Sequence, residues 1–420
     1  MFDGEVVTSI NDDGDKEYGG LLILKHKVED FEFYTLYGHN KVRSVLKNKI
    51  GAKIKKGDVI AEIANYPENG NWAPHLHFQI MLSTLNYKID FPGVCYYNQI
   101  DVWKGLCPNP NLLFKSVDLN YTNDKSDGEL INYRKKHLGK SLKLHYEEPI
   151  NIVRGEGVYL ISKNGRKYLD TINNVAHVGH ENESVVIEGQ SQMSILNTNS
   201  RYLHKSINEL AKEIIQTLPK KLNVIHFVNS GSEANELAVR MMKSHTGSND
   251  IIVSENGYHG NTNICVDISS YKFDGKGGKG APKNTHVIPM PTKFNGKYKG
   301  EEACEGYISE IKNSIKNLKS KNRDLGGFII EPIISCGGQV ELPDGFLKTA
   351  YDLIRENGGI CISDEVQVGC GRLGESFWGF ELHDVIPDII TIGKPLGNGH
   401  PIGAVVCTSE IAESFANGME

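Results

Sequence analysis

The second half of the chain alternates short apolar runs with amphipathic helices, and this alternation restricts the possible folds most. Six runs read as buried strands: "NVIHFVN" (223–229), "DIIVSE" (250–255), "GGFIIEPI" (326–333), "GICISDEVQV" (359–368), "PDIITI" (387–392) and "GAVVCTSE" (403–410). Two segments, 230–245 and 346–358, have helical spacing; the first starts with polar capping residues and the second ends at a glycine. The pattern predicts an α/β fold with a mainly parallel sheet covered on both faces.

The first 114 residues have a different pattern. Short β-rich segments separated by Gly, Asn and Pro occur at 21–28, 32–39, 56–64 and 74–82. Residues 115–140 are polar and weakly periodic, which indicates a linker with one short helix. We therefore expect a small all-β domain over 1–114, a linker over 115–140 and an α/β domain over 141–420.

Charge and cysteine content exclude several classes of partner. The net charge of −6 with mixed signs argues against a nucleic-acid-binding surface. No apolar run is long enough to span a membrane, and the first residues do not resemble a signal peptide. The 8 cysteines are scattered without a C-x-x-C pair, which favours free thiols in a reducing compartment. We expect a cytoplasmic protein with neither nucleic-acid nor membrane partners.

Lys394 follows the apolar run 387–392, with no other charge between Asp388 and the end of "ITIGKPLGNGH". A lysine at the carboxyl end of a parallel strand lies where open α/β sheets gather ligands, and its amine can form a Schiff base with an aldehyde cofactor. Pyridoxal phosphate (PLP) also needs a carboxylate beside its ring nitrogen, and Asp364 ends a predicted strand 30 residues earlier.

The other requirements of PLP are met by nearby motifs. Gln367 can bond the ring hydroxyl, and Gly231 and Ser232 begin a predicted helix whose backbone N–H groups suit a phosphate. Tyr258 and His259, in "GYHGNT", can cover the ring. Taken singly, each residue also fits a cap, a turn or a core position. Their appearance in chain order, each beside a predicted strand end, favours the cofactor site.

From about residue 145 to 420 the sequence resembles the class-III PLP-dependent aminotransferases of fold type I. The matching stretches include "FVNSGSEANELAVRMMK", "GYHGNT", "EPIISCGGQ", "ISDEVQVGCGRLGESFWGFE" and "PDIITIGKPLGNGHPIGAVV". The resemblance implies the internal aldimine on Lys394, Asp364 at the pyridine nitrogen and Gln367 at the ring hydroxyl. It also implies that Gly231 and Ser232 contact the phosphate and that Tyr258 stacks on the ring. Two further residues, His259 and Glu331, fall at family positions that line the site.

The motifs leave the reaction open. The leading interpretation is amino transfer from a small primary amine or amino acid. "NNVAHVGH", "LNTNSRYLH" and "SCGGQ" resemble the branch that contains ethanolamine-phosphate and phosphohydroxylysine phospho-lyases. Those enzymes expel phosphate from the carbon next to the deprotonated one. Both routes begin with Lys394 as the base that transfers the proton, so the cofactor motifs do not distinguish them.

A second histidine motif lies in the first domain. In a strand, His75 and His77 of "PHLHFQI" point to the same face, and His39 in "LYGH" is a candidate neighbour for a metal site; a solvent-exposed histidine pair explains the spacing equally well. With "IKKGDVIAEIAN", these motifs resemble the later part of a lysostaphin-like (LytM-type) zinc endopeptidase domain. The resemblance implies that His77 binds zinc while His75 and His39 assist catalysis.

Both family patterns extend beyond this chain. The peptidase family places its other two zinc ligands before "FDGEVV", so we expect no zinc and no peptidase activity here. The aminotransferase family continues past "ANGME" with a threonine that reaches the partner's phosphate and a small C-terminal domain. The family resemblance implies a homodimer. The remaining alternative is a non-catalytic or peptidoglycan-directed binding module, and the intact set of Asp364, Gln367 and Lys394 argues against it.

Overall fold

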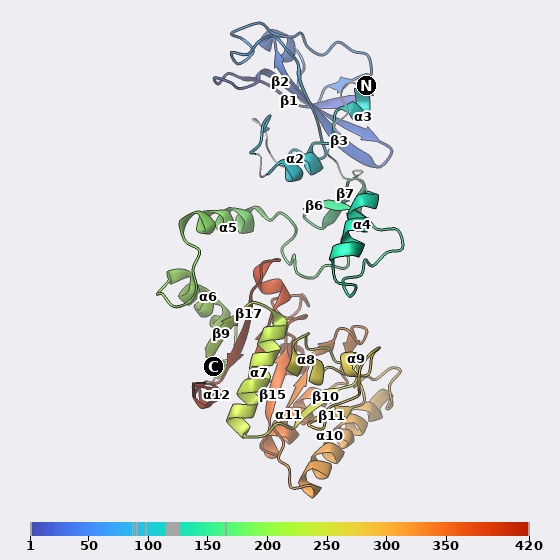
Figure 1. Ribbon diagram of the computed structural model, residues 1–420, viewed down its shortest axis with the longest axis vertical. Coiled ribbons are helices and arrows are strands. Elements are labelled where there is room, and N and C mark those ends of the chain that lie inside the picture. The colour runs from blue at the N-terminus through green and yellow to red at the C-terminus, as the bar shows by residue number, and fades with distance from the viewer. Residues whose placement is uncertain are drawn as a thin grey trace. The chain divides into compact units, whose positions relative to one another are not determined.

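The computed structural model divides the chain into two compact units, Met1–Thr171 and Ile172–Glu420. It describes residues 2–85, 87, 89, 91–96, 99–114, 127–163 and 166–418. Figure 1 shows the elements of both units along the chain. Each unit has hydrophobic clusters of its own.

Unit 1 contains a five-stranded antiparallel sheet in the order β4-β1-β2-β3-β5. Its two faces are packed by alternate residues of β2, with Leu21 and Ile23 in one cluster and Leu22 and Leu24 in the other. The expected small β domain is confirmed, although its described residues also form three short helices. The elements are β1 (Gly4–Asp12), β2 (Gly19–Val28), β3 (Phe31–Asn40), β4 (Lys53–Ile54), β5 (His77–Met81), α1 (Val42–Val45), α2 (Ile100–Leu106) and α3 (Asn111–Phe114).

The strand expected at 56–64 is wrong. The segment begins with a turn in which Asp58 Oδ2 accepts a hydrogen bond from Lys55 N at 2.8 Å. Gly57 has a φ of +100°, and Val59 is 89% exposed. Only Ile63 forms an isolated bridge, to Asn40. Alternating apolar residues therefore do not make a strand here, because the turn holds most of the segment away from a pairing partner.

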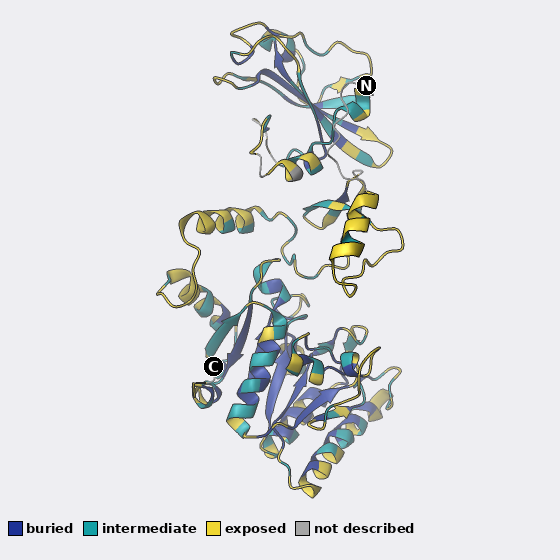
Figure 2. Cartoon of the chain, in the orientation of Figure 1, coloured by how far each residue is buried: buried dark blue, intermediate teal, exposed yellow. Residues whose placement is uncertain are grey.

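The rest of unit 1 follows the linker region. Residues 115–126 of the expected linker lie outside the described residues, and the short helix expected within it is α4 (Asp127–His137). A three-stranded antiparallel sheet follows, formed by β6 (Ile152–Glu156), β7 (Tyr159–Ser162) and β8 (Lys167–Leu169). Figure 2 shows that α4 is mostly exposed, and none of its residues is buried.

Unit 2 is built on a seven-stranded sheet in the order β11-β10-β12-β15-β16-β17-β9. All neighbours pair in parallel except β17, which is antiparallel to both β16 and β9. The predicted mainly parallel sheet is confirmed, and its six predicted strands are all present. The strands are β9 (Val224–Val228), β10 (Ile251–Ser254), β11 (Thr285–Ile288), β12 (Gly327–Ile330), β15 (Ile360–Asp364), β16 (Ile389–Ile392) and β17 (Gly403–Cys407); a separate hairpin pairs β13 (Ile333–Ile334) with β14 (Val340–Glu341).

Helices cover both faces of this sheet, and alternate strand residues face each layer. Ile251, Ile329 and Ile389 pack with the helix at Gly231–Thr246 (α7) and with α12 (Ser409–Phe415). Ile252, Phe328 and Ile390 pack on the opposite side with α10 (Ala303–Ser320) and α11 (Phe346–Glu356). The inner strands β10, β12, β15, β16 and β17 are accordingly buried on both sides, whereas the edge strands β9 and β11 are partly exposed (Figure 2).

Several elements of unit 2 were not predicted. They include β11, α10 and two helices before the sheet, α5 (Glu183–Ile195) and α6 (Lys205–Gln216); the shorter ones are α8 (Asn263–Asp267), α9 (Ser270–Phe273), η3 (Gly300–Glu302), η4 (Gly379–His383) and η5 (Lys394–Gly397). The helices formed by described residues do not include one with the length and apolar character that a bilayer crossing requires.

Candidate active site

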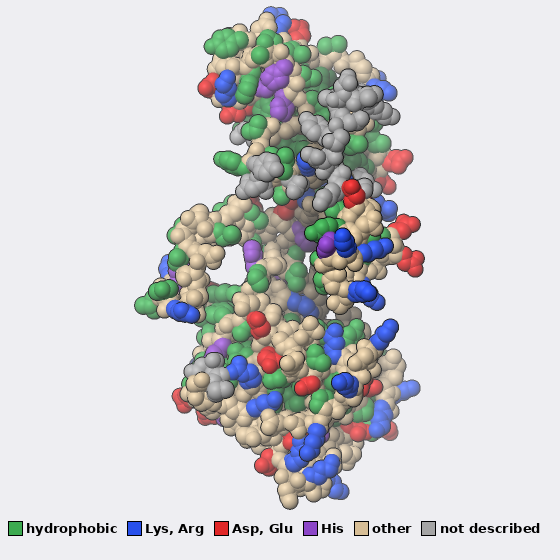
Figure 3. Space-filling model, viewed as in Figure 1, with side chains coloured by type: hydrophobic (Ala, Val, Ile, Leu, Met, Phe, Trp, Pro, Cys, Tyr) green, Lys and Arg blue, Asp and Glu red, His purple; other side chains and the backbone are tan. Residues whose placement is uncertain are grey.

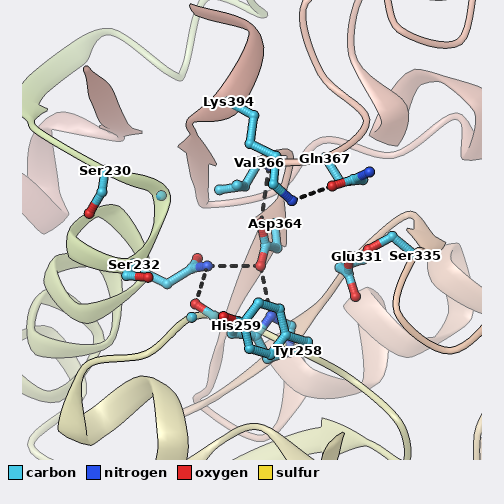
Figure 4. Close-up of a pocket in the computed structure, with 13 residues that line it drawn as sticks. Ser230, Ser232, Tyr258, His259, Glu331, Ser335, Asp364, Val366, Gln367 and Lys394 are labelled. Atoms are coloured by element: carbon cyan, nitrogen blue, oxygen red, sulfur yellow. Dashed lines mark hydrogen bonds and ion pairs between the residues drawn. The ribbon is translucent and has the colours of Figure 1, made fainter. Parts of the chain in front are cut away.

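All eight residues predicted for the PLP site line one cavity of about 150 Å³ in unit 2. Tyr258, Glu331, Asp364 and Lys394 follow or end β10, β12, β15 and β16, so the carboxyl ends of neighbouring parallel strands deliver them to one edge. Figure 4 shows these side chains converging from separate strands and from the start of α7. The remaining lining residues were not predicted: Ser230, Asn235, Gly260, Ser335 and Val366.

Asp364 is the buried centre of a hydrogen-bond network. Its Oδ2 accepts from Asn235 Nδ2 at 2.8 Å and from His259 Nδ1 at 2.7 Å. Its Oδ1 accepts from Val366 N at 3.1 Å and from Thr391 Oγ1 at 3.4 Å. Four donors stabilise this side chain as a carboxylate, which is the form that can pair with a protonated ring nitrogen.

Asn235 links three parts of the site through one side chain. Its Nδ2 also donates to the backbone O of His259 at 2.8 Å, so one amide group joins α7, the loop after β10 and the end of β15. A sequence signal for this residue existed: Asn235 is a polar residue in the buried stripe of α7 that contains Ala234, Ala238 and Val239. A buried asparagine in an apolar helical stripe requires hydrogen-bond partners, which identifies it as a candidate site residue.

The N-terminus of α7 is capped so that its first N–H groups remain available. Ser230, the N-cap, accepts from Glu233 N through Oγ at 3.1 Å, and Glu233 Oε2 accepts from the N–H of the preceding residue, Asn229, at 2.6 Å. Gly231 and Ser232 open the helix and line the cavity. Helix N-termini bind anions through such N–H groups and the helix dipole, so this end of the cavity suits a phosphate.

Close backbone packing explains two glycines at this end. A Cβ on Gly231 would lie 2.5 Å from Val366 Cγ1. Gly260 has a φ of +129°, and a Cβ there would lie 2.6 Å from Ser232 Oγ. The strand-end loops and the helix start therefore approach each other as closely as they do only because these positions lack side chains.

Lys394 is the first residue of η5 and is partly buried. Its Nζ donates to Gln367 Oε1. Figure 4 shows both side chains at the same end of the cavity, above Asp364. An amine that lines the same cavity as a buried carboxylate can form the covalent link to an aldehyde cofactor and can transfer a proton.

Tyr258 and His259 form another wall of the cavity. The Tyr258 ring lies 5.8 Å from the Tyr271 ring, and Lys272 Nζ lies 5.5 Å from the Tyr258 ring centroid. Burial raises the pKa of the Tyr258 hydroxyl, so it stays neutral at physiological pH. His259 is fixed by Asp364 on its side chain, and Ser269 Oγ accepts from its backbone N at 2.8 Å.

Glu331 is buried directly after β12, with 3% of its surface exposed. Ser335 Oγ donates to its Oε1, whereas Oε2 has no hydrogen-bond partner within the described part of the chain. Burial, followed by the charge of Asp364, raises the pKa of the Glu331 carboxyl to about 7. The cavity thus holds one well-bonded carboxylate and one carboxyl that loses its charge easily.

The residues present fit PLP. The cavity offers helix N–H groups for a phosphate, a buried carboxylate for a ring nitrogen, an aromatic face and an amine. Within the described residues, three buried polar atoms around it also lack partners: Asn235 Oδ1, His259 Nε2 and Glu331 Oε2. Buried polar atoms without partners are rare in folded proteins, so their concentration here indicates a site that is completed by a polar ligand.

The three histidines of the predicted metal motif in unit 1, His39, His75 and His77, are neighbours, but the predicted strand pair is wrong. The strand β5 begins at His77, so His75 precedes it and the two imidazoles do not share a strand face. The His39 ring lies 4.4 Å from that of His75 and 5.8 Å from that of His77, and His39 Nδ1 is bonded to Asn69 O at 2.9 Å. Burial, together with the other two imidazoles, lowers the pKa of His77 to about 4. In the part of the chain that the structure describes, no three His, Cys, Asp or Glu side chains are arranged to hold a metal ion.

Comparison with known proteins matches both parts of the chain to families. The sequence model of the class-III aminotransferases matches residues 143–420, and that of peptidase family M23 matches residues 1–89. An "Alanine–glyoxylate aminotransferase 2-like" protein of Drosophila melanogaster is 42% identical over 72% of this chain and 62% of its own length. The "Ethanolamine-phosphate phospho-lyase homolog 1" of Caenorhabditis elegans is 35% identical over 69% of this chain and 65% of its own length.

A solved structure extends this similarity to the fold. A phospholyase from Arthrobacter, in complex with phosphoethanolamine, is 34% identical with a TM-score of 0.64, over 68% of this chain and 67% of that one. The chain spans about 60 to 65% of the length of the curated relatives that it matches. The resemblance inferred from the motifs is therefore confirmed for residues 143–420, and the chain belongs to the class-III aminotransferase family.

Proposed function

We propose that this chain binds pyridoxal phosphate and acts as a PLP-dependent enzyme on a small primary amine or amino acid. The observation that carries the proposal is the gathering of eight residues of different chemistry, from four strand ends and one helix start, in a single cavity. A scaffold protein has no need for a lysine, a buried carboxylate and an open helix N-terminus in one place.

Each residue has a separate task in this proposal. Gly231 and Ser232 bind the phosphate, Tyr258 and His259 cover the ring, and Asp364 keeps the ring nitrogen protonated. Gln367 orients Lys394 and contacts the ring hydroxyl, while Glu331 lines the far side. The cofactor supplies the electron sink that makes a proton on the substrate carbon removable. Lys394 Nζ accepts that proton and returns it at the position that the reaction requires.

The leading candidate reaction is amino transfer. It is supported by the family to which the chain belongs and by the 42% identity to the Drosophila aminotransferase-like protein. The chain's own residues would remove the proton at the amine-bearing carbon and return it elsewhere. A water molecule would then supply the oxygen of the carbonyl product, and the amino group would pass by way of the cofactor to an acceptor.

A phospho-lyase reaction is the second candidate, with a phosphorylated amino alcohol such as ethanolamine phosphate as substrate. It is favoured by the similarity to the Arthrobacter and C. elegans proteins. Lys272 also supports it, because its ammonium lies beside the cavity-lining Tyr258 and suits a substrate phosphate. In this reaction the proton would leave the amine-bearing carbon. The bond between the next carbon and the phosphate oxygen would then break, and the phosphate would leave with the electron pair of that bond.

Parallel assays on the PLP-loaded protein separate the two reactions. One assay follows inorganic phosphate released from phosphoethanolamine without a keto acid, and the other follows amine transfer from alanine to glyoxylate. Amino transfer without phosphate release supports the leading candidate, and phosphate release alone supports the second. A loaded, folded protein inactive in both assays and across a panel of small amines would contradict the proposal.

We also propose that the enzyme works as a homodimer. Support comes from α5 and the segment that follows it, where Met193, Ile195 and Leu203 are 74%, 76% and 99% exposed. Figure 3 shows hydrophobic side chains on the surface over the segment between α5 and α6. Apolar side chains gathered in one exposed segment are typical of a surface that another chain covers.

For the remaining parts we propose the assignment made from the sequence: a partial lysostaphin-like domain over 1–114, a linker over 115–140 and the PLP domain over 141–420. The first domain would hold no tightly bound zinc, and metal analysis of the purified protein tests this. A cytoplasmic location is supported by the free thiol state of all eight cysteines. Fractionation of the source cells tests that location, because one curated relative, from Homo sapiens, is a mitochondrial protein.

A further inference from the structure

Two buried carboxyl groups line the same small cavity. Asp364 ends β15 and Glu331 follows β12, and these strands are neighbours in the sheet. Only 2% of Asp364 and 3% of Glu331 is exposed. Two carboxylates at this depth repel each other and lose their hydration, so the pair favours a state that shares one proton.

The hydrogen-bond donors decide which of the two carries the proton. Asp364 accepts four hydrogen bonds, from Asn235, His259, Val366 N and Thr391. Glu331 accepts from a single residue, Ser335, and its Oε2 has no hydrogen-bond partner within the described residues. A carboxylate is stabilised by donors, whereas a protonated carboxyl has its own O–H to offer. The negative charge therefore belongs on Asp364, and the proton belongs on Glu331.

The other titratable groups around Glu331 do not reverse this assignment. His259 is engaged with Asp364 through Nδ1, and Lys394 is bonded to the neutral amide of Gln367. Tyr258 and Cys336 remain neutral, since burial raises the pKa of each. Burial and Asp364 raise the pKa of Glu331 to about 7, which agrees with the donor count.

We propose that Glu331 acts in its protonated form as a positioning residue, donating a hydrogen bond from Oε2 to an anionic oxygen of the bound cofactor. Figure 4 shows Glu331 and Ser335 on the side of the cavity away from Ser230 and Ser232, so the phosphate and the O–H group would hold opposite ends of the ligand. The inference rests on the proposed PLP binding. It adds that the cavity presents one negative charge, rather than two, to an anionic ligand.

The ligand-free test is infrared difference spectroscopy on wild-type protein and the Glu331→Gln variant. We expect the wild-type spectrum to contain a protonated carboxyl C=O band at pH 6 that E331Q lacks and that fades by pH 8.5. A matched Glu365→Gln variant identifies the signal of the other buried glutamate. Absence of a Glu331-specific band at pH 6 would overturn the proposal, whatever the protein does with PLP.

The second test measures the PLP dissociation constant between pH 6 and 8.5 by absorbance titration. The amide introduced by E331Q is a neutral donor at every pH, so this variant should bind as tightly as wild type at pH 6 and become the tighter binder above pH 7, by about tenfold per pH unit. A Glu331→Ala variant, which lacks the donor, should bind more weakly at every pH. An E331Q variant that binds more weakly than wild type at every pH would mean that the carboxylate is the working form.

The two hypotheses fail in different ways. If wild-type protein does not bind PLP at pH 6, the proposed function fails, and the infrared result still reports on the proton of Glu331. If wild type binds PLP and the E331Q and wild-type affinities follow the same pH dependence, the proposed function stands and the role of Glu331 is overturned.

Discussion

At the scale of single residues, buried carboxyl groups determine much of the chemistry expected of this chain. Glu365 is fully buried next to Asp364 but is not among the residues that line the cavity. Its carboxyl group accepts hydrogen bonds from Gly379 N at 2.6 Å, Phe380 N at 3.0 Å and Ser363 Oγ at 2.9 Å. It ties the end of β15 to η4. Of these two adjacent residues, Asp364 lines the cavity, whereas Glu365 stabilises the contact between β15 and η4.

Glu365→Ala should destabilise unit 2 strongly. The substitution leaves two backbone N–H groups and one hydroxyl buried without an acceptor, at about 1 to 3 kcal/mol each before the loop relaxes. We expect a loss of about 2 to 4 kcal/mol in the free energy of unfolding, measured by urea denaturation. Glu356→Ala, on the exposed side of α11, is the matched control and should change stability by less than about 0.5 kcal/mol. Equal effects of the two substitutions would contradict the structural role of Glu365.

The pH dependence of stability should carry the signature of Glu331. Its pKa is about 7 in the folded chain, above the value of 4.5 of an ordinary glutamate, so folding favours its protonated form. The associated stability is present below pH 4.5 and is lost as pH rises through about 7, by roughly 3 kcal/mol. Between pH 5 and 7.5 the unfolding free energy of the ligand-free protein should therefore fall less in E331Q than in wild type. Parallel curves for the two proteins would show that Glu331 titrates normally.

The residues that sequence reasoning found and missed differ in how they act. The eight predicted residues lie in motifs at strand ends or at a helix start, where position alone predicts contact with a ligand. Asn235 and Ser335 were missed because they act through their hydrogen-bond partners, Asp364 and Glu331, and sequence spacing does not show these pairings. For Asn235, its place in the buried stripe of α7 was the one usable signal.

At the scale of elements, α7 positions one end of the site through its first turn. Gly231→Ala should place a methyl group against Val366, move the helix start and lower PLP affinity by at least about tenfold. Gly247→Ala, at the other end of the same helix, is the matched control: Gly247 has a φ of +71° and open space, so this change should cost about 1 kcal/mol of stability without affecting PLP. Absorbance titration measures both affinities, and equal losses would contradict a role of the helix start in binding.

The strand sequence predicted a parallel sheet but not the direction of β17. Only residues 393–402 separate β16 from β17, and they contain no crossover helix. A parallel connection needs a dozen or more residues, so this short link requires an antiparallel neighbour. The information was therefore present as a loop length, although the alternation of strands and helices did not reveal it. By contrast, the apolar pattern of the 56–64 segment wrongly predicted a strand, because the turn at its start sets the backbone conformation there.

At the scale of the whole molecule, the exposed apolar side chains of α5 and the segment after it support the proposed homodimer. A Met193→Glu/Ile195→Glu variant places charges on the exposed end of α5 and should lower the dimer fraction in sedimentation equilibrium, with unchanged far-ultraviolet circular dichroism. The control is Lys212→Glu/Glu213→Lys on the exposed side of α6, which leaves the apolar surface intact. A wild-type protein that is monomeric at all concentrations with PLP bound would contradict the homodimer proposal.

Family and fold class at this scale could be predicted from sequence because long motifs occur in a fixed order around the strand ends. Chemical outcome could not, because amino transfer and phosphate elimination share the same cofactor residues and the same base. The choice depends on contacts to the substrate, such as the one that the proposed phospho-lyase reaction would need from Lys272, whose Nζ lies 5.5 Å from the Tyr258 ring centroid.

The most direct test of the central claim is to locate the cofactor on the chain. The protein, with PLP added, is reduced with borohydride, digested and mapped by mass spectrometry, with Lys394→Ala as the control. We predict a visible absorbance band that disappears on reduction and a single labelled peptide that contains Lys394. Two results would contradict the assignment of this cavity as a PLP site: a folded wild-type protein without the absorbance band, or a K394A variant that is labelled as strongly as wild type.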